Sequence, residues 1–380
     1  MSNTPQLFIE HTGGDRQRLT TGVLPAQRLQ EQIQDRAILA ADKIEKSQIQ
    51  PASLDLRLGD RAYCVSTSFL PGETKTVRDR LKLLAWDQID LTEGTILRAG
   101  CIYIIPIQEM LDLPSKIWGL ANAKSSTGRL DIFARVITDF SWQFDRIQEG
   151  YSGPLFLEVS PRTFHVKVRK GSRLSQLRLK RGIPGNYESF HRQLEEETEL
   201  VGSTHRPKHI KGARLFSVSL TSSNQSEIIG FRAKKFCPPI DVDEIGALDP
   251  ADYWDPLFTS PEGLILDPHN FYILASKQDV SVPSSAAAEM LAYDTLVGEF
   301  RVHYAGFFDP GFGLVATGGM AKAVLEVRSH EVPFLIEDDQ VVGRLIYEQL
   351  TDFPSKLYGR DVGSYRTQGL RLAKQFVEWR

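Results

Sequence analysis

The sequence has no apolar run that approaches the roughly 18 residues of a membrane-spanning helix. Residues 1–6 contain no basic stretch followed by an apolar one, so no secretory signal is expected. A net charge of -3 over 380 residues gives no electrostatic indication of a nucleic-acid partner. We therefore expect a cytoplasmic chain with neither a membrane nor a nucleic acid as its partner.

Cysteine and metal-binding patterns are also scarce. The three cysteines, Cys64, Cys101 and Cys237, are odd in number and far apart, which is typical of reduced thiols in a core. The sequence has no Cys-x-x-Cys element, and its eight histidines show no ligand spacing. We expect no zinc site and no metal held by protein ligands alone.

What the chain does contain is enough apolar sequence for two domains, with 41% hydrophobic residues over 380 positions. Short β-branched and aromatic segments, separated by Gly, Pro and Ser, predict a mainly β fold of closed or sandwich-like sheets. The strands are expected within 96–107, 155–159, 164–168 and 174–179. Helices are expected at 25–46 and 185–201, and the polar stretch 202–211 marks a boundary. The predicted units are a partly disordered 1–20, a first repeat 21–205 and a second repeat 206–380.

An internal duplication organises these two repeats. An offset of 168 residues places Leu157-Glu158-Val159 on Leu325-Glu326-Val327. An offset of 169 places Tyr103-Ile104 on Tyr272-Ile273. The scaffold is therefore predicted to occur twice.

One hexapeptide is not duplicated. The first copy reads Lys-Ser-Ser-Thr-Gly-Arg at 124–129, whereas the second reads Tyr-Asp-Thr-Leu-Val-Gly at 293–298. Two cations and adjacent hydroxyls on one turn suit a polyphosphate, because Arg binds phosphate oxygens in bidentate fashion. A Ser-rich turn with solvated charges would use the same residues, but it has no need to lose both cations in one copy. The difference therefore favours an anion site in the first copy.

The two glutamates, Glu158 and Glu326, are by contrast retained in both copies. Each lies in a strand between apolar residues, where it either faces solvent or lines a cleft as a general base with a raised pKa. A Gly-containing turn precedes each strand, at 145–153 and 307–313, and both turns have the character of tight hairpins. The pattern leaves the two interpretations of each glutamate open.

With these residues assembled, the chain resembles the dCTP deaminases of the trimeric dUTPase-like β fold. Residues 124–130 are similar to the Arg-Ser-Ser-x-x-Arg-Leu motif that holds the triphosphate in that family, with Lys124 replacing the leading Arg. Asp309-Pro310-Gly311-Phe312 resembles the deoxyribose hairpin, and residues 53–59 resemble the early Asp-x-Arg-Leu-Gly strand. The resemblance implies two tandem dUTPase-like β-barrel or jelly-roll-type repeats with a few short helices.

The resemblance also implies roles for particular residues. Those for the triphosphate are Lys124, Ser125, Ser126, Thr127, Gly128 and Arg129; for the deoxyribose and base, Asp309, Gln148, Phe156 and Leu157; for the C-terminal closing segment, Tyr358, Tyr365, Arg366 and Gln368. The implied catalytic residues are Glu158, Glu326, Ser125 and Arg146. Arg146 favours Glu158 as the base and Asp309 favours Glu326, so the choice between the glutamates stays open.

The implied chemistry is hydrolytic deamination of dCTP to dUTP and ammonia by a glutamate-activated water without zinc. Such a reaction belongs to pyrimidine deoxynucleotide synthesis. Mg²⁺ is expected, bound mainly through the triphosphate. The resemblance further implies dUTP and dTTP as ligands and a homo-oligomer. Two alternatives remain: a dUTP pyrophosphatase or bifunctional dCTP deaminase/dUTPase, and a non-catalytic nucleotide-binding regulator.

Overall fold

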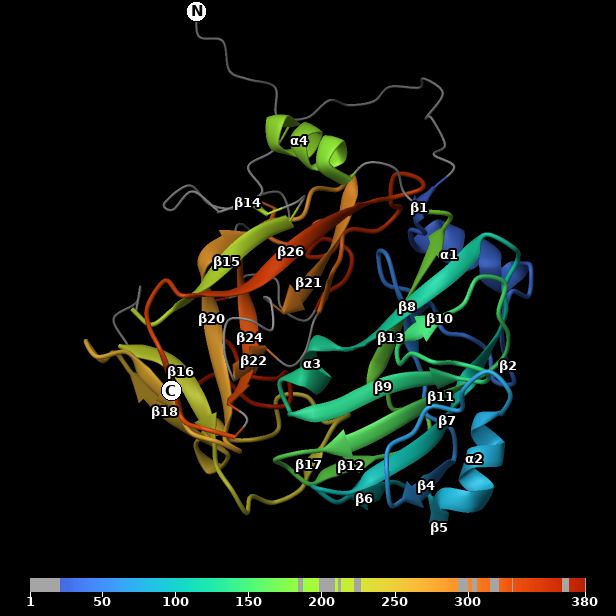
Figure 1. Cartoon of the computed structure of the whole chain (residues 1–380), viewed down its shortest axis with the longest axis horizontal. Coiled ribbons are helices and arrows are strands. Elements are labelled where there is room, and N and C mark those ends of the chain that lie inside the picture. Colours follow the sequence, from blue (N-terminus) through green and yellow to red (C-terminus); the bar gives the residue numbers. More distant parts are fainter. Residues whose placement is uncertain are drawn as a thin grey trace, which may run out of the picture.

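The computed structural model describes residues 21–183, 187–197, 209–210, 213–221, 227–292, 300–302, 306–314, 321–329, 331–363 and 369–379. Within these ranges the chain is mainly strand, which confirms the predicted class. We call residues 21–183 the first half and residues 187–379 the second half. The two halves lie side by side, with β1 to β13 in one and β15 to β26 in the other (Figure 1).

The regular elements of each half are as follows. The strands of the first half are β1 (Gly22–Val23), β2 (Ile38–Ala40), β3 (Leu54–Leu56), β4 (Arg61–Val65), β5 (Ala85–Asp90), β6 (Thr95–Leu97), β7 (Ile102–Asp112), β8 (Ile117–Ala123), β9 (Ile132–Thr138), β10 (Arg146–Ile147), β11 (Ser152–Pro161), β12 (Val166–Val168) and β13 (Ser175–Arg181). Those of the second half are β14 (His209–Ile210), β15 (Ala213–Ser219), β16 (Ile228–Ala233), β17 (Ile240–Asp241), β18 (Trp254–Phe258), β19 (Leu264–Leu266), β20 (Phe271–Val280), β21 (Ala286–Ala292), β22 (Phe300–Val302), β23 (Phe307–Phe308), β24 (Ala321–Ser329), β25 (Phe334–Ile336) and β26 (Val341–Gln349). The helices are α1 (Ala26–Gln34), α2 (Val77–Leu84), α3 (Ser125–Gly128) and α4 (Tyr187–Glu197), with 3₁₀ turns η1 (Lys46–Gln48) and η2 (Pro250–Asp252).

Each half places its glutamate in a central strand. In the first half β11 lies between β7 and β9, and Glu158 pairs with Ile104 and Arg135 across the ladder. In the second half β24 lies between β20 and β22, and Glu326 is opposite Ile273. Both glutamates are buried.

Two sequence predictions needed correction. The helix expected at 25–46 ends at Gln34, and Arg36 has a φ of 62° that stops it. The chain then continues as β2, because Ile38 is buried and pairs with Leu111. The segment 96–107 is two strands rather than one, since Gly100, with a φ of 84°, turns the chain between β6 and β7.

Packing crosses between the halves. β17 pairs in parallel with β12, although the two strands lie on opposite sides of the boundary expected at 202–211. The buried side chains of Trp254 and Phe376 join the same apolar cluster as the first half's core. Most of 202–211 lies outside the described residues. The halves therefore share one core at their junction.

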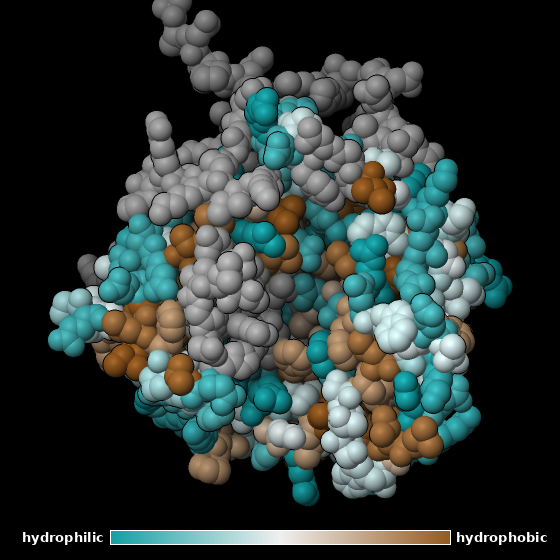
Figure 2. Space-filling view, in the orientation of Figure 1, coloured by the Kyte–Doolittle hydropathy of each residue, from teal (hydrophilic) through white to brown (hydrophobic). Residues whose placement is uncertain are grey.

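The outer surface shows no continuous apolar belt on the face drawn in Figure 2, where hydrophobic residues occur in small groups among hydrophilic ones. No helix among the described residues is both long and apolar enough to cross a membrane.

Candidate functional site

A cavity of about 700 Å³ lies at the junction and is lined by residues of both halves. Lys124, Ser125 and Arg129 reach it from the first half. Asp309 and Glu326 reach it from the second. The fold therefore brings the hexapeptide of one copy next to the glutamate of the other copy and to its turn at 309–313, within a single chain.

The hexapeptide forms a single tight turn, α3. The amides of Thr127 and Gly128 both donate to the carbonyl of Lys124, at 2.8 and 3.0 Å, and close the turn. The Thr127 hydroxyl donates to the Leu174 carbonyl at 2.8 Å, so this side chain fixes the turn to the neighbouring loop. Ser125 is exposed toward the cavity and Ser126 is nearly buried beside it. The turn thus presents hydroxyls to the cavity while its threonine is used structurally.

Both cations of the hexapeptide have fixed positions. The Lys124 ammonium pairs with Asp55 of β3, whose other carboxylate oxygen is buried without a hydrogen-bond partner. Arg129 is buried, and its Nη1 donates to the carbonyls of Arg371 and Leu372 at 3.0 and 3.4 Å. Its Nε lies 3.9 Å from Oε1 of Glu326. Arg129 therefore joins the C-terminal segment to the glutamate.

Glu326 is the most perturbed carboxyl of the cavity. Burial raises its pKa to about 8, and the nearby Arg129 opposes that rise. Only 4% of the residue is exposed. A carboxyl that titrates near neutral pH can both accept and donate a proton under physiological conditions.

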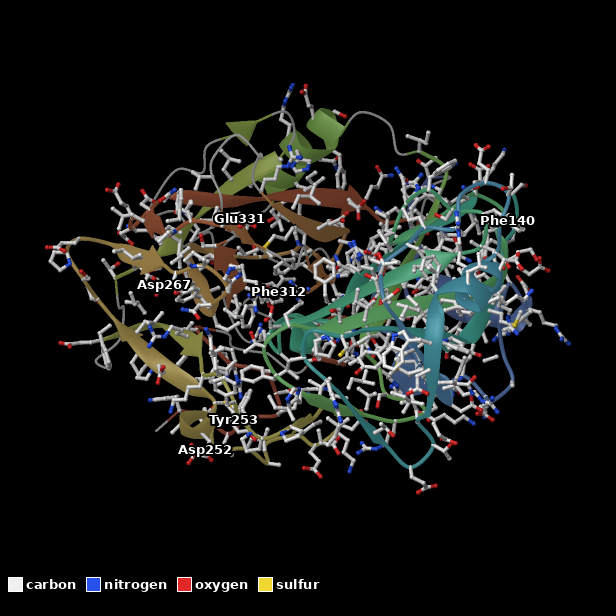
Figure 3. The ribbon with its side chains drawn as sticks, turned by 60° about the horizontal axis from the view of Figure 1, so that its bottom comes forward. Phe140, Asp252, Tyr253, Asp267, Phe312 and Glu331 are labelled. Atoms are coloured by element: carbon white, nitrogen blue, oxygen red, sulfur yellow. The ribbon has the colours of Figure 1, made fainter. Side chains whose placement is uncertain are left out.

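The segment after β23, predicted as a tight hairpin, is a turn whose flanking strands pair elsewhere: β23 with β21, and β24 with β20 and β22. This turn supplies a second perturbed carboxyl and an aromatic wall. Burial raises the pKa of Asp309 to about 6, although Arg178 lies 3.5 Å away and opposes the rise. The Phe312 ring packs edge-on against Phe308 and tilts against Tyr358. Figure 3 shows Phe312 near the centre of the molecule, between the two halves.

The turn after β23 requires glycine at two positions, because the backbone of other segments lies very close to it there. Gly311 has a φ of 98°, and a Cβ there would lie 2.8 Å from the Tyr358 carbonyl oxygen. Gly313 has a φ of 66°, and a Cβ there would lie 2.0 Å from the Val280 carbonyl oxygen. Neither position admits a side chain without displacing backbone.

The first-half glutamate lies elsewhere. Glu158 accepts hydrogen bonds from Arg135 Nε at 3.2 Å and from the Ser68 hydroxyl at 2.6 Å. The Arg135 guanidinium stacks over the Phe144 ring at 3.6 Å. Glu158 does not line the 700 Å³ cavity. It is buried in an ion pair with Arg135 rather than beside the hexapeptide.

Other predicted residues also fall outside the lining of this cavity. Arg146 lies over the Trp118 ring at 3.9 Å, and Gln148 is exposed in the turn after β10. Phe156 and Leu157 are buried in apolar clusters of the first half. Tyr358 does line the cavity. Tyr365, Arg366 and Gln368 lie outside the described residues, as does the second copy of the hexapeptide at 293–298.

Several lining residues were not predicted from the sequence. Asp55 belongs to a motif that was recognised, but no pattern gave it a place in the site. Arg173 and Asp243 enter from loops distant in sequence. Lys374 and Gln375 come from the C-terminal segment, and burial together with the nearby Lys124 lowers the pKa of Lys374. The cavity thus gathers Lys124, Arg129, Arg173 and Lys374, a set of cations suited to a polyanion.

Comparison with known proteins agrees with this arrangement. Residues 20–183 match the N-terminal domain model of 2′-deoxycytidine 5′-triphosphate deaminase, and residues 187–376 match the C-terminal domain model. The crystal structure of 2′-deoxycytidine 5′-triphosphate deaminase from Agrobacterium tumefaciens is 48% identical, with a TM-score of 0.84, and the match covers 88% of this chain and 100% of that one.

Shorter relatives match part of the chain. The "dCTP deaminase, dUMP-forming" of Persephonella marina is 27% identical over 41% of this chain and 81% of its own length. The "dCTP deaminase" of Halorubrum lacusprofundi is 30% identical over 34% of this chain and 62% of its own length. Because the two domain models together span most of the sequence, the chain belongs to the 2′-deoxycytidine 5′-triphosphate deaminase family and is a hydrolase acting on a C–N bond.

Proposed function

We propose that this enzyme deaminates dCTP to dUTP and ammonia in the 700 Å³ cavity, which we call the catalytic cavity, with Glu326 as the group that moves protons. The single observation that carries the proposal is the position of Glu326, buried 3.9 Å from Arg129 of the hexapeptide. In the proposed reaction a water oxygen attacks C4 of cytosine, and the C4–N4 bond breaks. Glu326 takes the first proton from the water and gives it to ring N3, where it stays in the uracil product. It then moves the remaining proton of the new C4 hydroxyl to N4, so that the C4 carbonyl forms and ammonia leaves.

Substrate binding follows from the charges of the cavity. We assign the triphosphate to Lys124, Ser125, Ser126 and Arg129, because cations and hydroxyls satisfy phosphate oxygens. We assign the deoxyribose to Asp309 and the aromatic wall of Phe312. Asp309 is buried, so a hydrogen bond from a sugar hydroxyl would offset part of its desolvation.

We infer that the chemistry is zinc-independent and that Mg²⁺ arrives with the nucleotide. The described residues contain no group of three His, Cys, Asp or Glu side chains arranged to hold a metal ion. The cavity offers the unpartnered Oδ1 of Asp55, but a hard dication needs several oxygen ligands. The phosphates of the substrate would supply most of them, and the ion would neutralise their charge.

A second candidate is the bifunctional reaction that also releases pyrophosphate. It is favoured by the name of the Persephonella marina relative, which is described as dUMP-forming. The same cavity could hold the triphosphate for either outcome, so the products must be measured.

The products distinguish the two candidates. With purified protein, dCTP and Mg²⁺, we expect one ammonia per dCTP consumed, dUTP as the nucleotide product and no pyrophosphate. Parallel assays with CTP and dCMP test whether the enzyme requires the deoxyribose and the triphosphate. An assay with dUTP tests whether it releases pyrophosphate from the deaminated nucleotide. Ammonia with equimolar pyrophosphate would instead establish the bifunctional enzyme, and no ammonia from dCTP would refute the deaminase.

The two glutamates offer a matched pair of variants. Glu326→Gln should lower kcat by roughly 10²–10⁴-fold, because the amide cannot accept the proton. Glu158→Gln, the control, removes a charge at the corresponding strand position and should leave kcat near that of the unmodified enzyme. Circular dichroism would verify that both variants fold. Loss of turnover only in Glu158→Gln would assign the chemistry to a site in the other half.

The pKa of Glu326 sets a pH dependence. A general base acts when deprotonated, so kcat/KM should rise with pH up to about 8 and fall about tenfold per unit below it. Since Arg129 holds this pKa down, Arg129→Ala should move the inflection to higher pH. The measurement is kcat/KM for dCTP from pH 6 to 9. A flat profile over that range in the unmodified enzyme would contradict the assignment.

Arg129 should also contribute to binding of the triphosphate. Its loss should cost about 1.5–3 kcal/mol, or roughly 10- to 150-fold in KM for dCTP, as expected for a charge-assisted hydrogen bond. Arg146→Ala is the control, because Arg146 lies over Trp118 and outside the cavity. Equal KM values in the two variants would remove Arg129 from the phosphate site.

A further inference from the structure

A second cavity, of about 250 Å³, lies at another part of the junction between the halves. Its walls come from 162–165 of the first half and from 233–237 and 269–271 of the second. No residue that lines it also lines the 700 Å³ cavity. We call it the junction pocket.

The junction pocket has a positive lining. Arg162 and Lys235 both line it and are exposed. Neither forms an ion pair with any residue that the structure describes, whereas the nearby Arg328 is held by Asp131. No Asp or Glu is among the described residues of the lining. Two cations around a small cavity without a carboxylate favour an anionic occupant.

The neutral groups of the junction pocket add donors. His165 accepts a hydrogen bond from the Ala99 amide through Nδ1 at 2.9 Å, so its proton lies on Nε2. Asn270 brings a side-chain amide. Burial raises the pKa of the Cys237 thiol, which therefore contributes no negative charge at neutral pH. These groups can donate to an oxyanion without opposing it electrostatically.

An aromatic side chain stands at the rim. Phe236 is 101% exposed, and its backbone has a φ of 62°, which is unusual for a bulky residue. The ring gains nothing from burial in this position, although it lines the junction pocket. An exposed ring beside two cations is suited to stacking on the base of a nucleotide whose phosphate lies in the cavity.

A network of four residues borders the junction pocket. Arg328 of β24 pairs with Asp131 and donates to the Thr163 hydroxyl at 2.8 Å, and its Nη1 donates to the His269 carbonyl at 3.2 Å. Thr163 and His269 line the junction pocket. Asp131 follows Leu130, which lines the catalytic cavity. The Arg328–Asp131 ion pair thus contacts two residues of the junction pocket and is adjacent in sequence to a residue that lines the 700 Å³ cavity.

We propose that the junction pocket binds a small phosphate-bearing anion, with its phosphate between Arg162 and Lys235. Its volume is about a third of that of the catalytic cavity, which suits inorganic phosphate, pyrophosphate or the phosphate end of a nucleoside monophosphate. A base, where the ligand has one, stacks on Phe236. The site is independent of the reaction assigned to Glu326.

The test is calorimetric titration of the full-length enzyme with inorganic phosphate, pyrophosphate and dUMP. The variant combines Arg162→Ala with Lys235→Ala. The matched control combines Arg36→Ala with Lys75→Ala, which removes the same charge from exposed positions outside both cavities. We expect the variant to lose one class of binding sites, weakened at least about tenfold, while the control retains it. In the absence of added anion, kcat and KM for dCTP should be unchanged in both proteins.

The ligands and a third variant separate the outcomes. Tighter binding of dUMP than of phosphate, abolished by Phe236→Ala, would place a nucleotide base on the ring. Equal binding of the three probes would restrict recognition to the phosphate. Identical isotherms for the unmodified enzyme, the Arg162→Ala/Lys235→Ala variant and the control would overturn the proposal. This outcome does not depend on the KM of the Arg129→Ala variant for dCTP, which tests the catalytic cavity separately.

Discussion

A buried charge network joins the two halves beside the 700 Å³ cavity. Arg178 of β13 is fully buried and donates through Nη1 to the Ala288 carbonyl at 3.0 Å and to Glu348 at 3.2 Å. Its Nη2 donates to the carbonyl of Phe308, the residue before Asp309. Lys180 pairs with the same Glu348. Removing one partner of such a network would leave an uncompensated buried charge, so the network favours the packing that brings the turn at 309–313 to the cavity lined by the hexapeptide.

Lys180 and Glu348 are 168 residues apart, which is the offset of the duplication. Two identical copies would place like charges at these positions, and like charges could not share this buried contact. Divergence to Lys in one copy and Glu in the other therefore favours packing of a first half against a second half over packing of two identical halves. The two copies have also diverged around their glutamates. Glu158 forms an ion pair with Arg135, whereas Glu326 lines a cavity and lies 3.9 Å from Arg129.

Local pattern was enough to predict the mainly β fold and the turns at 124–129 and 309–312, because each depends on neighbouring residues. It was wrong in making 309–312 a hairpin, because β23 pairs with β21 and β24 pairs with β20 and β22, which are strands distant in sequence. It could not choose between Glu158 and Glu326, since both lie in the same Leu-Glu-Val strand and differ only in partners brought by distant segments. Asp55, Arg173 and Lys374 were missed for that reason. The prediction that the helix continues past Gln34 was wrong. The apolar residues beyond it have helical spacing, but strand pairing of Ile38 with β7 takes precedence over that local preference.

The C-terminal segment gives Arg129 its position. Phe376 packs edge-on against Tyr253 and Trp254, and the Val377 amide donates to the Leu248 carbonyl at 2.9 Å, so the segment is anchored in the core. That anchor presents the carbonyls of Arg371 and Leu372 to Arg129. Because these carbonyls accept from Nη1, they orient the guanidinium without neutralising its charge. The nearby Arg129 lowers the pKa of Glu326, so the anchor of the C-terminal segment also affects the protonation of this carboxyl; in the proposed function it thereby links the residue assigned to the phosphates with the residue assigned to proton transfer.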